Sequence, residues 1–269
     1  MGMMKIGPFL EKLGKRISNT AYLLQNPGYR EIRRNGGARD LYRILNKPWL
    51  ERGRIGTVLD VGANEGQFIK VARVLFPAAS ILAFEPNPSL TDCLRTLLGP
   101  SGIHAVFPFA CGREPATMPL NLTKFSPSTS FLSPTSLRIP GFPAVETEKT
   151  IEVKVERLDQ VVQRHGSARK PFLLKLDVQG FELEVLQGAA GILPDVAAVL
   201  CEVNTAPFYE GQAAFEDICA FMRQHSFRLI DIGEPIRARE TDEVLYFDVA
   251  FLNNRAAFAT PSDNDRAGK

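Results

Sequence analysis

The chain has few of the residues that build covalently or metal-stabilised scaffolds. Its 269 residues include only four cysteines, three histidines and one tryptophan. The cysteines lie far apart and form no C-x-x-C pair, at positions Cys93, Cys111, Cys201 and Cys219. This spacing argues against a zinc ribbon or a disulfide framework, and it is typical of proteins in a reducing cytoplasm.

Long hydrophobic runs are also absent. No apolar stretch approaches the roughly 18 residues that a membrane-spanning helix needs. Glu11, Lys12, Lys15 and Arg16 interrupt the N-terminal apolar residues, so we expect no signal peptide. These features together predict a cytoplasmic location.

The net charge of +2 is too small to indicate a polyanionic partner, but it is unevenly distributed. Residues 1–54 contain twelve basic and four acidic residues, a net charge of +8, whereas the rest has twenty basic and twenty-six acidic residues, a net charge of −6. A solvated helical extension is the favoured interpretation of the basic segment. Peripheral contact with an anionic membrane or an acidic protein is the alternative, and we expect no DNA partner.

Patterning divides the chain into three predicted parts. Residues 1–54 form a basic, mostly helical extension, with Asn26-Pro27-Gly28 as an interruption and a short helix restarting at Leu41–Leu45. Residues 55–253 form the main domain, with an insertion rich in Pro, Ser and Thr at about 113–150. Residues 254–269 form a flexible polar tail.

Short apolar strands alternate with helical segments through the main domain. The predicted strands are 57–61, 80–84, 103–110, 172–176, 197–203, 227–232 and 246–252, and the predicted helices are 66–75, 90–98, 181–193 and 215–225. This alternation indicates an α/β fold with a doubly wound, mostly parallel, seven-stranded sheet. The last two strands have no helix between them and predict an antiparallel edge strand. Within the insertion, residues 149–155 alternate as an added strand.

The first predicted strand leads into a glycine-containing loop, in the segment TVLDVGANEGQF at Thr57–Phe68. In a doubly wound sheet, ligands bind beyond the carboxyl ends of the strands. Asp60 places a carboxylate at the strand tip, Gly62 allows a sharp turn and a close approach by a ligand, and Gly66 opens the next helix. Ala63 and Asn64 complete this predicted cofactor-binding loop.

Two cofactors compete for the loop. A dinucleotide fingerprint requires G-x-G-x-x-G, but the third and sixth positions here are Asn64 and Gln67, and two acids would face a pyrophosphate. The pattern of an acid followed by G-x-[GN]-x-G fits at every position and is that of S-adenosylmethionine sites. An NAD-dependent oxidoreductase or epimerase is therefore the less favoured alternative.

The second strand ends in Phe84-Glu85-Pro86-Asn87-Pro88. Glu85 follows Asp60 at about the separation at which a βαβ unit delivers an acid to ribose hydroxyls. A carboxylate accepts two hydrogen bonds from a vicinal diol, so Glu85 is the predicted ribose ligand. Asn87, and Ala110 at the end of the third strand, complete the predicted cofactor-binding set.

A further motif runs from Phe172 to Ala189, as FLLKLDVQGFELEVLQGA. Together with DVGANEGQF and FEPNP, it resembles the FkbM family of S-adenosylmethionine-dependent methyltransferases over about residues 57–252. The resemblance implies a Rossmann-like class I methyltransferase fold. It also implies O-methylation of hydroxyls on saccharides, glycans or other small-molecule natural products. A methyltransferase acting on RNA or protein is the alternative.

Lys175 and Asp177 are the predicted catalytic residues, because they share a face of the fourth strand and Asp177 reaches its crevice end. We expect Asp177 to orient the acceptor hydroxyl or to accept its proton. For Lys175, a purely structural buried ion pair with Asp177 or Glu202 is the favoured interpretation, and a functional role in orienting or neutralising a neighbouring carboxylate is the alternative.

Three other kinds of group in the sequence are candidates for the predicted site. Asp177, Glu202 and Asn204 form a weak candidate set of metal ligands, and we predict no metal. The histidines His104, His165 and His225 occupy positions usual for structural histidines. The Ser126–Phe131 stretch is interpreted either as a cover over the acceptor or as an ordered insertion over a sheet edge.

Overall fold

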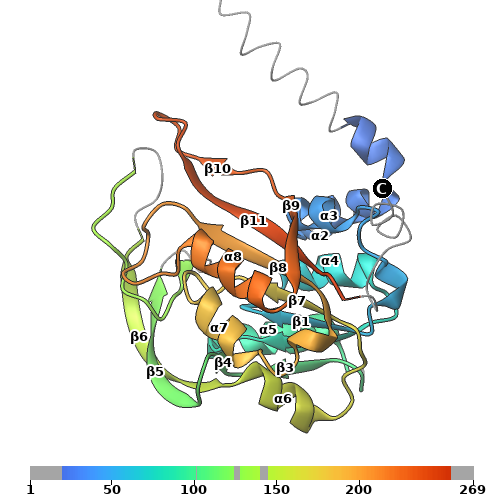
Figure 1. The fold of residues 1–269 in the computed structure, drawn as a ribbon, viewed down its shortest axis with the longest axis horizontal. Helices are drawn as coiled ribbons and strands as arrows, with labels where there is room; N and C mark the ends of the chain where they lie inside the picture. The colour runs from blue at the N-terminus through green and yellow to red at the C-terminus, as the bar shows by residue number, and fades with distance from the viewer. Residues whose placement is uncertain (1–19, 101, 124–127, 140–144, 256–269) are drawn as a thin grey trace, which may run out of the picture.

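The computed structural model describes residues 20–100, 102–123, 128–139 and 145–255, which form a mixed β-sheet with helices on both faces (Figure 1). Within these residues the main sheet has eight strands, in the order β10-β11-β8-β7-β1-β2-β3, and β9 pairs with β11. Its strands are β1 (Thr57–Val61), β2 (Ser80–Phe84), β3 (Ala105–Phe107), β7 (Phe172–Leu176), β8 (Val196–Asn204), β9 (Phe227–Ile232), β10 (Ile236–Arg237) and β11 (Val244–Asn253).

Parallel pairing dominates this sheet. Strands β3, β2, β1, β7 and β8 are parallel neighbours, whereas β11 is antiparallel to both β8 and β9. The predicted doubly wound, mostly parallel sheet with an antiparallel strand is confirmed. Two details differ from prediction: β11 lies between β8 and β9 rather than at the edge, and the sheet has eight strands rather than seven. The reason is the ten-residue length of β11, whose outer side pairs with both β9 and the two-residue β10.

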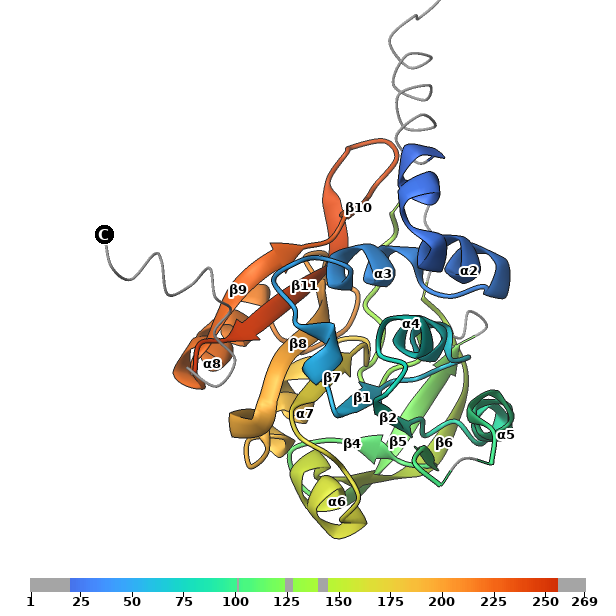
Figure 2. The same cartoon turned by 90° about the vertical axis from the view of Figure 1, so that its right-hand side faces the viewer.

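Helices cover the two faces of the sheet in separate groups (Figure 2). One group is α2 (Pro27–Asn35), α3 (Arg39–Leu45), α4 (Gln67–Leu75) and α5 (Pro88–Leu98); the other is α6 (Leu158–His165), α7 (Glu182–Gly188) and α8 (Phe215–Gln224). Short 3-10 turns lie at Arg52–Arg54 and Leu193–Asp195. Successive residues of a strand point to opposite faces, so Val58 packs in the first helical layer and Leu59 in the second.

The extension before β1 packs on the main domain through α2 and α3. Tyr29, Ile32 and Leu45 belong to the same buried cluster as the apolar face of α4. The predicted interruption is confirmed at Asn26, which is not helical, and Pro27 begins α2 at a position where its missing N–H costs nothing. The apolar residues predicted to form a helix before Thr20, and residues 256–269 of the predicted tail, lie outside the described residues.

The predicted third strand is split in two. Pro108 has no N–H and cannot continue the ladder, so β3 ends at Phe107 and β4 (Ala110–Cys111) joins a second sheet. That sheet has the order β4-β6-β5, with β5 at Ala116–Thr123 and β6 at Thr147–Glu156. Strand β6 confirms the added strand predicted in the insertion, whereas β5 was not predicted.

The helix predicted over 181–193 is shorter than expected. Helix α7 ends at Gly188, where a side chain would meet the carbonyl oxygen of Gly112 at 1.9 Å.

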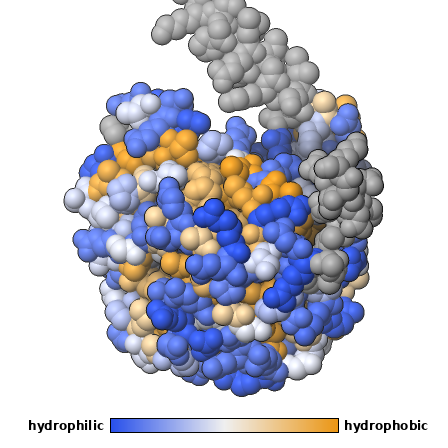
Figure 3. Space-filling model, in the orientation of Figure 1, coloured by the Kyte–Doolittle hydropathy of each residue, from blue (hydrophilic) through white to orange (hydrophobic). Residues whose placement is uncertain are grey.

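No helix within the described ranges is long and apolar enough to cross a membrane. The face seen in Figure 3 is mostly hydrophilic, and hydrophobic residues gather over β9 and β10, where Leu229, Ile232 and Ile236 are 40%, 50% and 39% exposed.

Candidate cofactor and acceptor site

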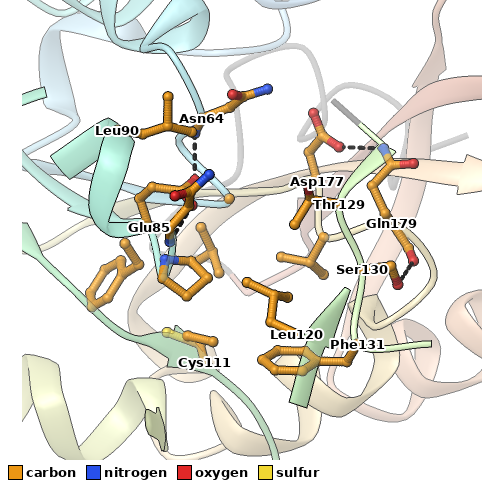
Figure 4. Close-up of a pocket in the computed structure, with 17 residues that line it drawn as sticks. Asn64, Glu85, Leu90, Cys111, Leu120, Thr129, Ser130, Phe131, Asp177 and Gln179 are labelled. Atoms are coloured by element: carbon orange, nitrogen blue, oxygen red, sulfur yellow. Dashed lines mark hydrogen bonds between the residues drawn. The ribbon is translucent and has the colours of Figure 1, made fainter. Parts of the chain in front are cut away.

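A pocket of about 640 Å³, partly open to solvent, lies beyond the carboxyl ends of β1, β2 and β7 (Figure 4). This is the crevice where doubly wound sheets bind their ligands. The predicted residues that line it are Gly62, Asn64, Glu85, Asn87, Ala110 and Asp177. The other predicted residues, Asp60, Ala63, Gly66 and Lys175, are not in its lining.

Gly62 brings the loop after β1 against the loop after β7. Its φ of 77° lies in the left-handed region, and a Cβ on it would lie 1.9 Å from the carbonyl oxygen of Asp177. The Gly62 and Ala63 amides both donate to the Phe84 carbonyl, so the loop continues the pairing of β1 with β2. Only glycine fits at position 62, because any side chain would push Asp177 away.

The second half of this loop makes a further tight turn. Asn64 has a φ of 47° and Gly66 a φ of 78°, and the Gly66 amide donates to the Ala63 carbonyl over 2.8 Å. Gly66 precedes α4 as its N-cap residue, and a side chain there would lie 2.4 Å from Leu97. The loop therefore presents Asn64 to the pocket while Ala63 and Gly66 shape it from behind.

Glu85 extends from the end of β2 into the same pocket and is only 6% exposed. One carboxylate oxygen accepts the Asn64 amide and the other accepts the Asn87 amide, each over 2.8 Å. Burial raises the pKa of Glu85, and these two hydrogen bonds oppose that rise. The carboxylate is thus fixed in place, and each oxygen keeps a lone pair for a ligand hydroxyl.

Lys175 and Asp60 lie opposite each other on β7 and β1. The Lys175 ammonium is 3.3 Å from the Asp60 carboxylate and 3.6 Å from that of Asp177, and it donates to the Gly62 carbonyl over 2.8 Å. Burial alone would lower the pKa of Lys175, but Asp60 and Asp177 together raise it above its ordinary value. Lys175 is therefore a buried cation behind the pocket, which ties the two loops together.

Asp177 is the first residue after β7 and lines the pocket with a side chain that is 38% exposed. Its amide donates to the Val61 carbonyl over 3.2 Å, which fixes its backbone beside the loop after β1. The structure therefore brings Asp177 to the same pocket as Glu85, on the opposite side from it (Figure 4).

Sequence reasoning did not single out Gln179, which also lines the pocket. Its side-chain nitrogen donates to Asp177 over 2.9 Å and to Glu202 over 2.7 Å. Tyr209, which was not singled out either, donates its hydroxyl proton toward the Gln179 side-chain oxygen over 3.0 Å. The available signal was the glycine that follows Gln179, because glycine indicates a turn with positive φ, and both Gln179 (56°) and Gly180 (95°) have one directly after the strand end.

Part of the insertion forms another wall. Thr129, Ser130 and Phe131 line the pocket, with Phe131 packed on Phe181 at a ring distance of 5.0 Å. These three residues belong to the Ser126–Phe131 stretch interpreted from sequence as a cover over the acceptor, and residues 126 and 127 lie outside the described ranges. Hydroxyls and an aromatic ring thus border the side of the pocket occupied by Asp177.

The three histidines lie in structural settings. The His104 ring accepts the Ile81 amide over 3.0 Å, the His225 ring contacts the Phe221 carbonyl at 2.9 Å, and His165 packs edge-on against Phe107. In the part of the chain that the structure describes, no group of three or more His, Cys, Asp or Glu side chains is arranged to bind a metal ion. Independence from metals remains a prediction.

Comparison with known proteins identifies the family. The sequence model of one protein family, the methyltransferase FkbM domain, matches residues 60–229, which is more than half of the chain. The chain belongs to the FkbM methyltransferase family. The resemblance found in the sequence motifs is thereby confirmed, as is the Rossmann-like class I methyltransferase fold that it implied. Membership decides against the NAD-dependent alternative.

Several curated relatives share this domain. The chain is 33% identical over 177 residues to the hexuronic acid methyltransferase AglP of Haloferax volcanii, a match covering 64% of this chain and 65% of AglP. It is 26% identical over 199 residues to the 2-O-methyltransferase NoeI of Sinorhizobium fredii, covering 71% of this chain and 78% of NoeI. It is 29% identical over 242 residues to the 31-O-demethyl-FK506 methyltransferase FkbM of Streptomyces tacrolimicus, covering 76% and 86%. The chain thus spans just under two thirds of the length of AglP.

The cofactor of the family is S-adenosylmethionine, and the pocket fits it. Glu85 offers a fixed, buried carboxylate to a ribose diol, and apolar walls at Leu90, Cys111 and Leu120 suit a purine. Among the described lining residues none is Lys, Arg or His, so a pyrophosphate would meet no cation there. A cofactor that carries a positive charge and no phosphate matches this lining.

Proposed function

We propose that this chain transfers a methyl group from S-adenosylmethionine to a hydroxyl group of a saccharide, glycan or other small-molecule natural product. The observation that carries the proposal is the pairing of two acids in one pocket. Glu85 is fixed by two backbone amides on one side, and Asp177 stands on the other beside a wall of hydroxyls.

The cofactor would be held by the loops after β1 and β2. Glu85 would accept the ribose hydroxyls, Asn64 and Asn87 would border it, and Gly62 would allow the ligand to approach the backbone closely. Ala110 at β4 would add to the apolar wall. When bound, S-adenosylmethionine supplies an electrophilic methyl group on a positively charged sulfur.

The acceptor hydroxyl would lie against Asp177. As its oxygen forms the new bond to the methyl carbon, the carbon–sulfur bond would break and the neutral thioether would leave. The proton of the hydroxyl must also leave, and a positioned carboxylate is a suitable base. We propose that Asp177 orients this hydroxyl and takes the proton. Lys175 does not reach the pocket; it acts as a positioning residue that neutralises Asp60 and steadies Asp177 from behind.

A saccharide is the acceptor class that the surroundings favour. Thr129 provides a hydroxyl for hydrogen bonds, and Phe131 provides a flat apolar face for the C–H side of a sugar ring. AglP, by its name, acts on a hexuronic acid, and NoeI methylates a 2-O position. The first name supports a sugar acid as acceptor, and the second supports an oxygen nucleophile.

The test is label transfer from tritiated S-adenosylmethionine to separate pools of methyl glucoside, methyl glucuronoside, total RNA and casein. We expect label in a saccharide, and the amount should be unchanged by a chelator. The label should resist alkaline hydrolysis, which would release methanol from a methyl ester, and should be released as methyl iodide by hydriodic acid. Label confined to RNA or casein, or no label in either saccharide, would overturn the proposal. Loss of transfer with chelator would overturn metal independence alone.

The basic N-terminal region supports a peripheral contact with an anionic membrane. Helix α2 carries Arg30, Arg33 and Arg34 around an open hollow that also includes Leu23, and neighbouring Leu24 is 69% exposed. An exposed leucine beside arginines suits a lipid surface better than a soluble acidic protein. Sedimentation with phosphatidylserine-containing vesicles tests this: we expect binding that weakens with salt and with Arg33→Glu/Arg34→Glu. Equal binding to neutral vesicles would contradict it.

We also propose a cytoplasmic location. Cys111 and Cys201 are buried free thiols, Cys219 is half-buried and Cys93 exposed, and none forms a disulfide. Cell fractionation would test the location, and recovery of the protein outside the cytoplasm and its membranes would contradict it.

A further inference from the structure

Gln179 lies at the border of the pocket, where its side-chain nitrogen faces Asp177 (Figure 4). Its nitrogen donates to one oxygen of Asp177 over 2.9 Å and to one oxygen of Glu202 over 2.7 Å. Its side-chain oxygen lies 3.0 Å from the Tyr209 hydroxyl. A primary amide has two N–H protons, so this side chain joins two carboxylates and can serve both at once.

The backbone of Gln179 is held in an unusual conformation. Its φ of 56° lies in the left-handed region, which costs free energy for a residue other than glycine. The buried Glu182 side chain accepts the Val178 and Gly180 amides over 3.0 and 3.2 Å, and so holds the turn from both sides of Gln179. Backbone strain that neighbours over-determine is a mark of functional sites.

Gln179 is also tied to the wall on the acceptor side. The Ser130 hydroxyl donates to the Gln179 carbonyl over 2.7 Å. The Tyr209 hydroxyl lies 3.0 Å from the Ser128 carbonyl as well as 3.0 Å from the Gln179 side chain, and its one proton can serve only one of them at a time. The placement of residues 128–130 is thereby coupled to the side chain that holds Asp177.

The two carboxylates joined by Gln179 need a shared donor. Asp177 follows β7 and Glu202 lies near the end of the neighbouring β8, and both carboxylates contact the same Gln179 nitrogen, so two negative charges there would repel each other. Burial, followed by repulsion from Asp177, raises the pKa of Glu202 well above its ordinary value. When Glu202 is protonated, Asp177 is the only charged member of this pair. The Gln179 amide then fixes the direction of the Asp177 carboxylate.

We propose that Gln179 is a positioning residue for methyl transfer: its side-chain amide holds Asp177 toward the acceptor, and its contacts with Ser130 and Tyr209 link that orientation to the acceptor wall. This inference rests on the proposed role of Asp177 as the group that takes the acceptor proton. It adds that this role of Asp177 depends on the side-chain amide of Gln179, which contacts neither Glu85 nor Lys175.

The matched variant is Gln179→Gly. Glycine adopts a φ of 56° without strain, so this change removes the amide while the turn keeps its shape. Label transfer from tritiated S-adenosylmethionine to methyl glucoside is measured for the wild type, Gln179→Gly, Asp177→Asn and the double variant, with cofactor affinity by calorimetry. Gln163→Ala, an exposed change on α6, serves as the control.

We expect Gln179→Gly to lower kcat about 10- to 100-fold, the loss typical of a misplaced catalytic group, with the cofactor Kd within about threefold of the wild type. In the Asp177→Asn background the same change should cost less than about threefold, because its effect passes through Asp177. The acid limb of the pH–kcat profile should move to higher pH, since the two carboxylates lose their shared donor.

Equal losses from Gln179→Gly with and without Asp177, or an unmoved pH profile, would overturn the inference. If Gln179→Gly unfolds, Tyr209→Phe tests the same link: it removes one hydroxyl and should lower kcat about threefold or more, and an unchanged kcat would contradict the coupling. Normal turnover by Asp177→Asn would instead refute the proposed function. Lost turnover by Asp177→Asn with normal turnover by Gln179→Gly would refute only the role of Gln179.

Discussion

The backbones of Gly62 and Asp177 touch: a Cβ on Gly62 would lie 1.9 Å from the carbonyl oxygen of Asp177. This contact joins the loop that would hold the cofactor to the loop that carries the proposed base. The Lys175 ammonium donates to the Gly62 carbonyl and lies 3.6 Å from the Asp177 side chain, so the same two loops are also linked by charge. The relative position of the two ends of the pocket is therefore built into the backbone.

Gly62→Ala should lower the free energy of unfolding by about 3 kcal/mol or more. The new methyl group would clash with the backbone carbonyl of Asp177, and the φ of 77° is strained for alanine. Urea denaturation measures the loss. Gly211→Ala is the matched control: its φ is 75° but nothing lies within 4 Å of the added Cβ, so we expect about 1 kcal/mol. Equal losses for the two variants would contradict the close approach.

Glu85→Gln should weaken S-adenosylmethionine binding by about 10- to 100-fold, because hydrogen bonds to a charged acceptor are worth about 1.5–3 kcal/mol. Calorimetric titration measures the affinity. Glu65→Gln changes an exposed acid in the loop after β1 that is not in the pocket lining, and it should leave the affinity unchanged. An unaltered Kd for Glu85→Gln would remove Glu85 from the ribose site.

Lys175→Met should destabilise the fold by about 3–5 kcal/mol, since it leaves the fully buried Asp60 carboxylate without its cation. The double variant Lys175→Met/Asp60→Asn should recover part of this loss, because the uncompensated charge is gone. Both are compared by chemical denaturation. A loss below about 1 kcal/mol for the single variant would show that the ion pair does not organise the strands.

Glu182→Gln should flatten the dependence of stability on pH between about 5 and 8. Burial raises the pKa of Glu182 from 4.5 to about 7, although the Val178 and Gly180 amides oppose the rise. The folded state then binds the proton more tightly than the unfolded state, so this stability is full below pH 4.5 and is lost as the pH rises through about 7. Chemical denaturation at pH 5 and pH 8 measures the change in the free energy of unfolding. An equal change in the wild type and in Glu182→Gln would contradict the prediction.

The sequence predicts the elements whose pattern is local. Strands β1, β2 and β7 are uninterrupted apolar runs and were predicted with their observed bounds, at Thr57–Val61, Ser80–Phe84 and Phe172–Leu176. Strand β5 was missed because Pro119 and neighbouring polar residues hide its alternation, and the split at Pro108 was missed because the apolar run continues through it.

The residues of the candidate site likewise divide into those that sequence spacing predicts and those that it does not. The pocket positions of Glu85 and Asp177 follow from where their strands end, which sequence spacing gives. The contacts of Gln179 do not follow from spacing, because Glu202 and Tyr209 lie 23 and 30 residues further along the chain. The ion pair of Lys175 with Asp177, one of the two partners that the sequence predicts, is confirmed at 3.6 Å. Its nearer partner Asp60, at 3.3 Å, follows only from the register of β1 with β7.

The central claim is that Asp177 takes the proton of an acceptor hydroxyl in the pocket where S-adenosylmethionine binds. Its most direct test is the rate of methyl transfer to methyl glucoside by wild type and Asp177→Asn at saturating cofactor. The account predicts a fall of about 100-fold or more, the usual contribution of a positioned base, with the cofactor Kd unchanged within about threefold. Transfer by Asp177→Asn at the wild-type rate would contradict it.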